Sequence, residues 1–443
     1  MIKRFFSPKV LSGILVLAIA LTAAQWILSR QVVAVQNETY KSLKIFADVL
    51  GIVQKDYAEE KESKELIYSA LKGMIKKLDP HSSFLTPDDY KEMQIDTKGV
   101  FGGIGIEISM RDGVLTVVSP IEDTPADRAG IEAGDKIVKI EDKSTKDMSL
   151  TDAVKLMRGK KGTELNIHIM RESFNKPKLF TLTRARIKIK SVKFEKLDDG
   201  FGYVRLAQFQ ENSSKEIRKA LKKITPEGGL KGLVLDLRNN PGGLLTEAVG
   251  VSDIFLDSGM IVYTKGRDDV AKMEFRADAE GTEPDYPVIV LVNGGSASAS
   301  EIVAGALQDH KRAVILGTQS FGKGSVQTII PLTDGSAVRL TTSKYYTPSG
   351  RSIQAKGIEP DIIVEAAGPQ MHVKEKDLEG HLEAEKGSDK EADKKKKKIK
   401  IKESAKKNGN GSADEKAEDI QRTRAIDYLK SWHIFKGMLS DAS

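Results

Sequence analysis

The segment that decides the fold is VLVNGGSASASE, residues 290–301. An apolar strand pattern runs into a turn of glycine, serine and alanine, and a helical pattern follows the turn. A hydroxyl in such a turn is exposed, and the unpaired N–H groups at the start of the helix can stabilise an oxyanion. Serines at a helix start are also common N-caps without any chemistry. Taken alone, the segment favours that simpler role.

A second segment, GTQSFGKGSVQ at residues 317–327, favours chemistry. Lys323 lies between two glycines and precedes an apolar strand pattern. If the chain is extended from this point, Lys323, Ser325 and Gln327 share one face. A lysine acts as a general base only when neutral, so burial or nearby dipoles must lower its pKa. An amide on the same face can orient the amine without adding charge, whereas a solvent-exposed lysine in a glycine loop is the alternative.

Two more segments are rich in glycine: LDLRNNPGG at residues 235–243 and FGGIGI at residues 101–106. In the first, a strand ends in a turn that suits a second oxyanion donor, and Asp236 and Arg238 are interpreted as a structural ion pair. The second precedes a strand and no helix follows it, so it is not a dinucleotide-binding fingerprint. Its backbone N–H groups can capture a terminal carboxylate while the strand from Ile106 pairs with the peptide. A plain turn into a hairpin explains it equally well.

The periodicity of apolar residues predicts three kinds of structure along the chain. Helical spacing extends over residues 40–78. Short strands and two short helices follow from about residue 100 to residue 170, which predicts a compact module of about ninety residues. From residue 200 to residue 364 the pattern is α/β, and its buried strands are expected at 233–237 and 288–292.

Composition excludes several classes of function. The net charge is +7 and the pI is near 9.0, but the basic clustering lies largely in residues 394–407 and no nucleic-acid-binding motif accompanies it, so no nucleic-acid partner is expected. Without cysteine there is no thiolate nucleophile, disulfide or cysteine-bound zinc. None of the six histidines has a triad-like setting, and there is no His-Glu-x-x-His. We therefore expect no metal and no cofactor.

The N-terminus resembles an export signal. Lys3, Arg4 and Lys9 precede an uncharged run at residues 10–28, which Arg30 closes. The run is long for a cleaved signal and just long enough to span a bilayer. A cleaved signal and a membrane anchor are both consistent with it. The protein is therefore expected in the periplasm, or on the inner membrane facing the periplasm, with membrane contact through this segment if it is uncleaved.

Five motifs in order resemble the C-terminal-processing, or tail-specific, serine peptidases. The resemblance runs from about residue 43 to residue 368, and five ordered motifs are far more specific than any single one. The motifs are LDPHSSF (78–84), GGIGI (102–106), DLRNNPGG (236–243), SASASE (296–301) and FGKGSVQ (321–327).

The resemblance implies a role for each matching residue. The nucleophile corresponds to Ser298, the general base to Lys323, and the residue that orients the lysine to Gln327. The oxyanion donors correspond to the backbone N–H of Ala299 and of a glycine in the pair Gly242 and Gly243. The residues expected to bind the substrate tail are those of a PDZ domain loop: Gly102, Gly103, Ile104, Gly105 and Ile106.

The fold expected from this resemblance is multidomain α+β. It has a crotonase-like α/β peptidase core, an inserted β-rich PDZ domain and helical flanks at both ends. The predicted parts are a signal or anchor (1–30), a helical region (38–96), the PDZ domain (97–185), the Ser-Lys peptidase core (186–368), a disordered charged segment (369–420) and a final helix (421–443) with Ile426, Leu429 and Trp432 as its apolar face.

The implied function is a serine endopeptidase that recognises apolar C-terminal tails of proteins and cleaves near them. Whether the protein forms a homo-oligomer or binds an adaptor is left open. A PDZ scaffold on an inactive core is a rival, but it should have lost Ser298, Lys323 or Gln327. An acyl-CoA enzyme of crotonase type is a second rival, and both an export signal and a PDZ domain argue against it.

Overall fold

The computed structural model describes residues 38–267, 273–366, 373–384, 399–400 and 419–440. The predicted export segment therefore lies outside the described residues. Within these ranges, no helix combines the length and the apolar character needed to cross a bilayer.

The chain divides into two compact units, residues 1–74 and 75–443. The first unit contains a helix over residues 38–56 and the start of α2 (Ser63–Lys76). Apolar side chains of the first helix, such as Leu43, Phe46 and Val49, are exposed. The helical spacing predicted for this region is therefore present, but its apolar stripe has no partner among the described residues.

The second unit begins with β1 (Ser83–Leu85) and α3 (Pro87–Lys98). The hydroxyl of Thr86 accepts from Asp89 N at the start of α3, and Gly99 ends the helix in the left-handed conformation at φ 63°. The next residues form the module predicted to be a PDZ domain, called the PDZ module below.

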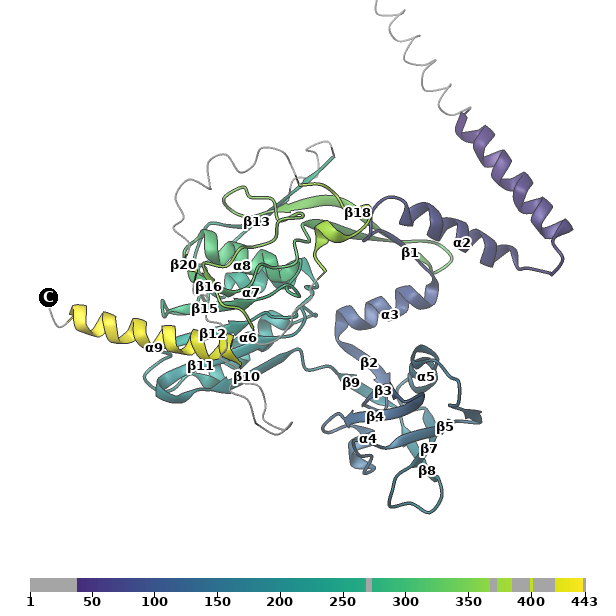
Figure 1. The fold of residues 1–443 in the computed structure, drawn as a ribbon, viewed down its shortest axis with the longest axis horizontal. Coiled ribbons are helices and arrows are strands. Elements are labelled where there is room, and N and C mark those ends of the chain that lie inside the picture. Colours follow the sequence, from purple (N-terminus) through teal and green to yellow (C-terminus); the bar gives the residue numbers. More distant parts are fainter. Residues whose placement is uncertain (1–37, 268–272, 367–372, 385–398, 401–418, 441–443) are drawn as a thin grey trace, which may run out of the picture. The chain divides into compact units, whose positions relative to one another are not determined.

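The module is a sheet of antiparallel strands with two short helices (Figure 1). The strand order is β3-β4-β5-β7-β8, with β6 paired to β5, and α4 and α5 are the two short helices expected in this region. Its elements are β3 (Ile106–Arg111), β4 (Val114–Pro120), α4 (Pro125–Arg128), β5 (Lys136–Ile140), β6 (Lys143–Ser144), α5 (Leu150–Met157), β7 (Glu164–Met170) and β8 (Lys178–Thr183).

Two strands close the module at its neck. β2 (Val100–Gly103) pairs antiparallel with β9 (Ala185–Lys188). The chain therefore enters and leaves the module through two adjacent strands, and this strand pair is the neck. Ile189 N donates to the carbonyl of Gly99 at 2.9 Å just outside this pair. The module is thus an insertion whose two ends lie together.

The α/β core is built on a mostly parallel sheet in the order β10-β11-β12-β15-β16-β19-β20. Only β10 runs antiparallel to its neighbour. The predicted strand at 288–292 coincides with β15, and the one at 233–237 is β12 shifted by one residue. The strands are β10 (Val192–Lys196), β11 (Phe201–Leu206), β12 (Gly232–Asp236), β15 (Val288–Val292), β16 (Ala313–Gly317), β19 (Ile362–Ile363) and β20 (Ile399–Lys400).

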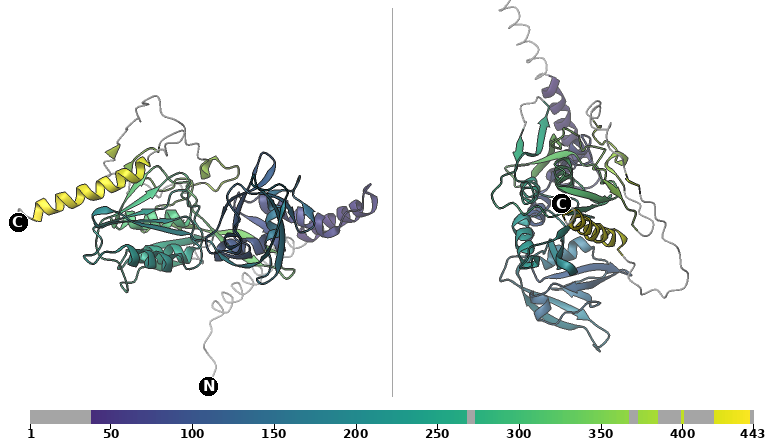
Figure 2. Two further views of the ribbon diagram at one scale, coloured as in Figure 1. Left: turned by 90° about the horizontal axis from the view of Figure 1, so that it is seen from below. Right: turned by 90° about the vertical axis from the view of Figure 1, so that its left-hand side faces the viewer.

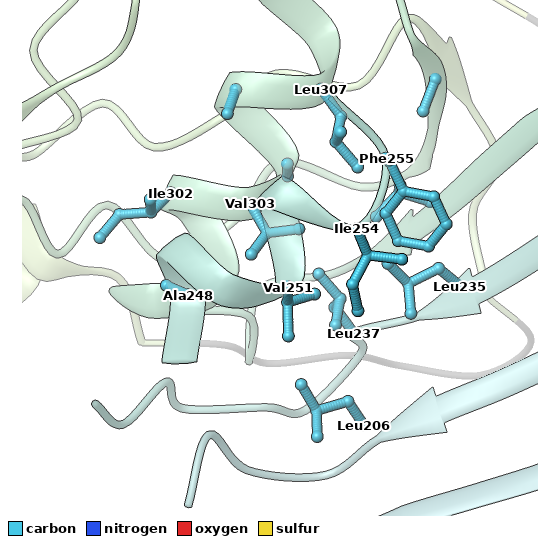
Figure 3. Packing of buried hydrophobic residues seen from close by; sticks show 14 of the residues in the cluster. Leu206, Leu235, Leu237, Ala248, Val251, Ile254, Phe255, Ile302, Val303 and Leu307 are labelled. Carbon is cyan, nitrogen blue, oxygen red and sulfur yellow. The ribbon is translucent and has the colours of Figure 1, made fainter. Parts of the chain in front are cut away.

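Alternate residues of these strands face two different helical layers. Leu233 and Leu235 pack with the helices α6 (Ser213–Ile224), α7 (Leu245–Asp253) and α8 (Ala299–Asp309). Val234 faces the other side, where α9 (Ile420–Ser440) packs. Figure 3 shows the first layer, in which side chains of α7 and α8 meet the ends of the strands. This packing fixes the C-terminal ends of β12 and β15, from which the candidate site is built.

α9 lies on the sheet (yellow in Figure 2) through Ala425 and Leu429, which are buried. Ile426 is partly buried against the same cluster. Trp432 is 58% exposed, so its predicted place on the apolar face is wrong. It lies three residues beyond Leu429, after the last buried turn of the helix.

A second sheet has the order β1-β18-β13-β14, and β17 also pairs with β18. Its strands besides β1 are β13 (Met260–Gly266), β14 (Glu274–Arg276), β17 (Ser325–Pro331) and β18 (Ala337–Tyr346). The pairing of β1 with β18 sets Ser83 opposite Arg339. It thereby brings the LDPHSSF motif to the strands that follow Lys323.

Candidate active site

The proposed nucleophile lies at a strained point of the chain. Ser298 is the N-cap of α8, and its backbone has φ 54° and ψ −112°. A residue with a side chain adopts such a conformation only when its surroundings impose it, and strain of this kind clusters at functional sites. Here the surroundings include Glu301, whose carboxylate accepts from Ser298 N at 2.8 Å.

The three serines of the motif differ in what their hydroxyls do. Ser296 is fully buried and donates to the carbonyl of Leu237 at 2.8 Å. Ser300 is fully buried and donates to the carbonyl of Asn240 at 2.9 Å. Ser298 is partly exposed, and its hydroxyl donates to no acceptor within the described part of the chain, facing only the N–H of Glu301 in the capping box. Of the three, Ser298 is the one available for reaction.

Two backbone N–H groups next to Ser298 lack an acceptor among the described residues: those of Ala299 and Gly243. Gly242 N is already bonded to Asn240 Oδ1 at 2.9 Å, which leaves Gly243 as the donor of the predicted pair. Gly242 has another part in the site. A Cβ on it would lie 2.9 Å from both Ala299 N and Ser298 Cβ, so only glycine allows this close approach.

Glu301 links the nucleophile to the base. The same oxygen, Oε2, accepts from Ser298 N at 2.8 Å and from Lys323 N at 2.9 Å. The other oxygen accepts from Gly322 N and from the Ser320 hydroxyl at 2.7 and 2.6 Å. Glu301 is fully buried, and burial raises its pKa to about 7 although these four donors favour the charged form. The sequence reasoning missed this residue, whose position three residues after an N-cap serine resembles an ordinary capping box.

The amine of Lys323 has a lowered pKa. Burial is the main cause, because it disfavours the charged form, and the charge of Arg339 lowers the pKa further. Three carboxylates oppose these effects without cancelling them: Glu375, Glu301 and Asp79. A lowered pKa is what a lysine needs to accept a proton from a serine hydroxyl.

Gln327 lies on the same strand face as Ser325, since its Nε2 donates to Ser325 Oγ at 3.3 Å and to Thr341 Oγ1 at 2.8 Å. The other end of this amide is unusual. Gln327 Oε1 is buried and has no hydrogen-bond partner in the described structure. A buried amide oxygen without a donor is costly, and the amine of Lys323, four residues earlier, could supply one.

The LDPHSSF motif supports Gln327 through a series of hydrogen bonds. Asp79 accepts from Ser82 Oγ at 2.7 Å, and Thr341 N donates to the same hydroxyl at 3.1 Å. Thr341 in turn holds the amide of Gln327. The motif therefore has a structural reason that the sequence alone did not reveal, because its partner lies in β18.

In the PDZ module, β3 is an edge strand that pairs with β4 alone among the described strands. Its second edge is free to pair with an extended peptide. Gly105 precedes it with φ 80°, and a Cβ there would lie 2.3 Å from Thr124. The N–H groups of Ile104 and Gly105 donate to no described backbone acceptor. All five predicted tail-binding residues thus lie in β2, at the start of β3 or in the turn between them.

Asp236 and Arg238 form the ion pair expected of them. Arg238 Nη2 lies 2.6 Å from Asp236 Oδ2 and 2.6 Å from Asp419 Oδ2, and Arg238 Nη1 also donates to Gln421. Tyr203 donates to Asp236 at 2.7 Å. The pair therefore fastens the start of α9 to the end of β12, and it is structural in position.

Within the described ranges, no group of three or more acidic or histidine side chains could hold a metal ion. His310 contacts the carbonyl of Met260 at 2.7 Å, and His81 contacts Glu375 at 2.7 Å.

Comparison with known proteins identifies the family. A profile of the PDZ domain matches residues 102–182, and a profile of peptidase family S41 matches residues 200–364. A carboxy-terminal-processing protease of Bartonella bacilliformis is 48% identical over 379 residues, which make up 83% of this chain and 87% of the relative. The chain belongs to peptidase family S41. It is a serine protease of the carboxy-terminal-processing kind and carries a PDZ domain.

Two further proteins are similar to the chain in sequence. A probable CtpA-like serine protease of Staphylococcus aureus is 38% identical and covers 82% of this chain and 73% of its own length. A solved structure, the photosystem II D1 C-terminal processing protease, is 31% identical over 72% of this chain and 92% of its own, with a TM-score of 0.43. The likeness of the S41 core to crotonase-like enzymes stays a prediction.

Proposed function

We propose that the protein is a Ser-Lys endopeptidase in which Ser298 is the nucleophile and Lys323 the general base. The observation that carries this proposal is the shared contact with Glu301: one carboxylate oxygen accepts from the backbone N–H of both residues. Among the described residues, Ser298 alone of its three serines has a partly exposed hydroxyl that donates to no acceptor. Lys323 has a lowered pKa.

The reaction is acyl transfer in two steps. Ser298 Oγ attacks the carbonyl carbon of the substrate while Lys323 takes its proton, and the N–H groups of Ala299 and Gly243 stabilise the oxyanion. Lys323 then protonates the leaving amine. Water hydrolyses the acyl-enzyme, with Lys323 again accepting a proton. Gln327 orients the lysine through its buried oxygen, which otherwise lacks a partner.

We infer further that the PDZ domain binds the C-terminal tails of protein substrates. A tail would add to the free edge of β3, with its carboxylate at the N–H groups near Gly103 and Gly105. Apolar tails fit the edge of β3, which lies beside the amphipathic helix α5. Export to the periplasm, suggested by the basic and apolar N-terminal sequence, would bring the enzyme to proteins with such tails.

Two variants test the catalytic assignment. Ser298→Ala and Lys323→Ala should each abolish hydrolysis of an unstructured peptide and keep the wild-type circular dichroism. Because the two residues act as a unit, the double variant should be barely worse than either one. In the wild type, kcat should rise with pH as the lysine loses its proton, below the ordinary lysine range, since its pKa is lowered.

The control is Ser300→Ala, which removes a neighbouring hydroxyl that is bonded to Asn240. It should retain turnover if it folds. Hydrolysis by Ser298→Ala at the wild-type rate would refute the proposal, and so would activity that is lost in EDTA and restored by zinc.

A further inference from the structure

A segment far along the chain lies against the loop that carries Lys323. We call residues 373–384 the strap and residues 318–324 the base loop. The strap lies inside the segment predicted to be disordered (369–420), and that prediction does not hold for these residues. They contain the 3-10 helix η2 (Glu375–Asp377), and their contacts reach the base loop at more than one point.

The strap holds the base loop on both sides of Lys323. On one side, Glu375 N donates to the carbonyl of Phe321 at 3.1 Å. On the other side, Gly324 N donates to Gln354 Oε1 at 3.0 Å, and the amide nitrogen of Gln354 donates to Glu375 Oε1 at 2.8 Å and to the carbonyl of Leu382 at 2.9 Å. The Gln354 side chain is therefore a bridge between the base loop and the strap.

Glu375 is the centre of these contacts. It is fully buried although the other residues of the strap are exposed or half-buried. Its Oε2 lies 2.7 Å from His81 Nε2, and this pair joins the strap to the LDPHSSF motif. A buried carboxylate is costly unless it is paired, and here both oxygens have partners. Lys374 adds an outer tie, since its amine donates to Gln319 Oε1 at 2.6 Å.

The geometry points to Glu375 as a positioning residue for Lys323. The strap fixes the base loop through Phe321 and Gln354, and the Glu375 carboxylate adds a negative charge that favours the protonated amine. This inference rests on the proposed function, because it assumes that Lys323 is the base. Glu375 does not touch the reacting atoms and acts through the loop and through its charge.

The charge around Lys323 comes from several elements. Arg339 of β18 favours the neutral amine. Glu375 of the strap, Glu301 of α8 and Asp79 before β1 favour the protonated amine. The imidazole of His81 contacts the Glu375 carboxylate at 2.7 Å. Removal of the Glu375 charge alone should therefore make the amine lose its proton at lower pH.

The experiment compares three full-length variants. Glu375→Gln removes the charge with little change in size, Glu375→Ala removes the side-chain contacts as well, and Glu379→Gln is the control because Glu379 is exposed on the same strap. The first readout is the pH profile of kcat. The second is hydrogen–deuterium exchange of peptides that contain residues 319–325, measured in a Ser298→Ala background so that it needs no activity.

Glu375→Gln should shift the rising limb of the kcat profile to lower pH, and Glu379→Gln should leave it in place. Glu375→Ala should also lower the plateau of kcat by roughly tenfold, because a displaced base aligns poorly with the serine. Exchange of the base loop should become faster in Glu375→Ala and stay unchanged in Glu379→Gln. A purely structural role would lower activity without moving the limb.

The inference is overturned if both Glu375 variants match Glu379→Gln in the pH at which kcat rises and in the rate of hydrogen–deuterium exchange of the base loop. It is also overturned if the plateau of kcat falls while the rising limb of the pH profile and the exchange rate of the base loop stay unchanged. Failure of the proposed function looks different: Lys323→Ala would retain hydrolysis. Because the exchange readout is independent of catalysis, the two failures can be told apart.

Discussion

At the scale of single residues, the buried carboxylate of Glu301 connects the two segments that carry the proposed nucleophile and base. It accepts four hydrogen bonds from the two segments that carry Ser298 and Lys323. A charge in this position costs free energy even with four donors, which is why its pKa rises to about 7. The alignment of nucleophile and base is therefore maintained at some expense of stability near neutral pH.

This leads to a prediction about stability and pH. The pKa of Glu301 is raised in the folded protein, from an ordinary value of 4.5 to about 7, so the native state holds its proton more tightly than the unfolded state does. Its stabilising contribution is complete below pH 4.5 and is lost as pH rises through 7. Glu301→Gln cannot titrate. Relative to this variant, the wild type should lose on the order of 3 kcal/mol of unfolding free energy across that window.

Urea denaturation of both proteins at a series of pH values from 4.5 to 7.5 checks this. The Ser298→Ala background prevents self-cleavage and serves both samples. If the two stability curves run parallel, the carboxylate does not titrate in this range and the account of its burial is wrong.

At the scale of secondary-structure elements, apolar runs predicted the core well. β15 begins and ends where its sequence pattern predicted, because all five residues are buried on both faces and no polar position blurs the signal. The order of strand, glycine turn and helix also predicted where Ser298 lies. These elements depend on local sequence, and local sequence was sufficient for them.

The strap, and the hydrogen bonds that link Asp79 through Ser82 and Thr341 to Gln327, could not be predicted in this way. Glu375 belongs to a segment whose charge is typical of disorder, and its burial depends on His81 and Gln354, which are distant in sequence. Glu301 resembled a helix cap for the same reason: its other donors come from the base loop. Contacts between distant residues decide these positions, and periodicity does not record them.

The edge strand β3 leads to a prediction for substrate tails. A carboxylate bound by backbone N–H groups makes charge-assisted hydrogen bonds worth roughly 1.5–3 kcal/mol, or about tenfold to a hundredfold in affinity. Amidation of the C-terminus of a tail peptide should therefore raise its Kd for the Ser298→Ala protein by roughly that factor. Calorimetric titration of the free-acid and amide peptides measures it.

Peptide chemistry is a cleaner test than mutation of Gly105. A side chain there would meet Thr124 and would need a strained φ, so the loop itself would change. A peptide extended by one glycine is the control for the added bulk. Equal affinity for acid and amide forms would mean that the loop does not read the terminal carboxylate.

At the scale of the whole molecule, the neck of the PDZ module makes its role testable. Because Gly99 and Ile189 are hydrogen-bonded to each other, residues 100–188 can be replaced by a short Gly-Ser linker without pulling the core apart. If the module only collects tails, this excision should raise KM and leave kcat unchanged. We expect kcat on a short chromogenic peptide to change as well, because an exported protease with an open site would damage its neighbours.

The control is a full-length protein with Gly103→Leu, which keeps the module and fills its loop beside Phe101. It should weaken tail binding and leave kcat on the short peptide nearer to the wild-type value. An excised protein with wild-type kcat would show that the module has no influence on the catalytic step.

The attachment of α9 has a consequence for engineering. Lys344 and Gln354 bind the carbonyls of Glu383 and Leu382, β20 pairs with β19, and Arg238 binds Asp419. The chain on the way to α9 is therefore fastened to the folded body at three successive points. A reporter or an affinity peptide spliced in between two of these points keeps every attachment, so the active site and the final helix should stay where they are.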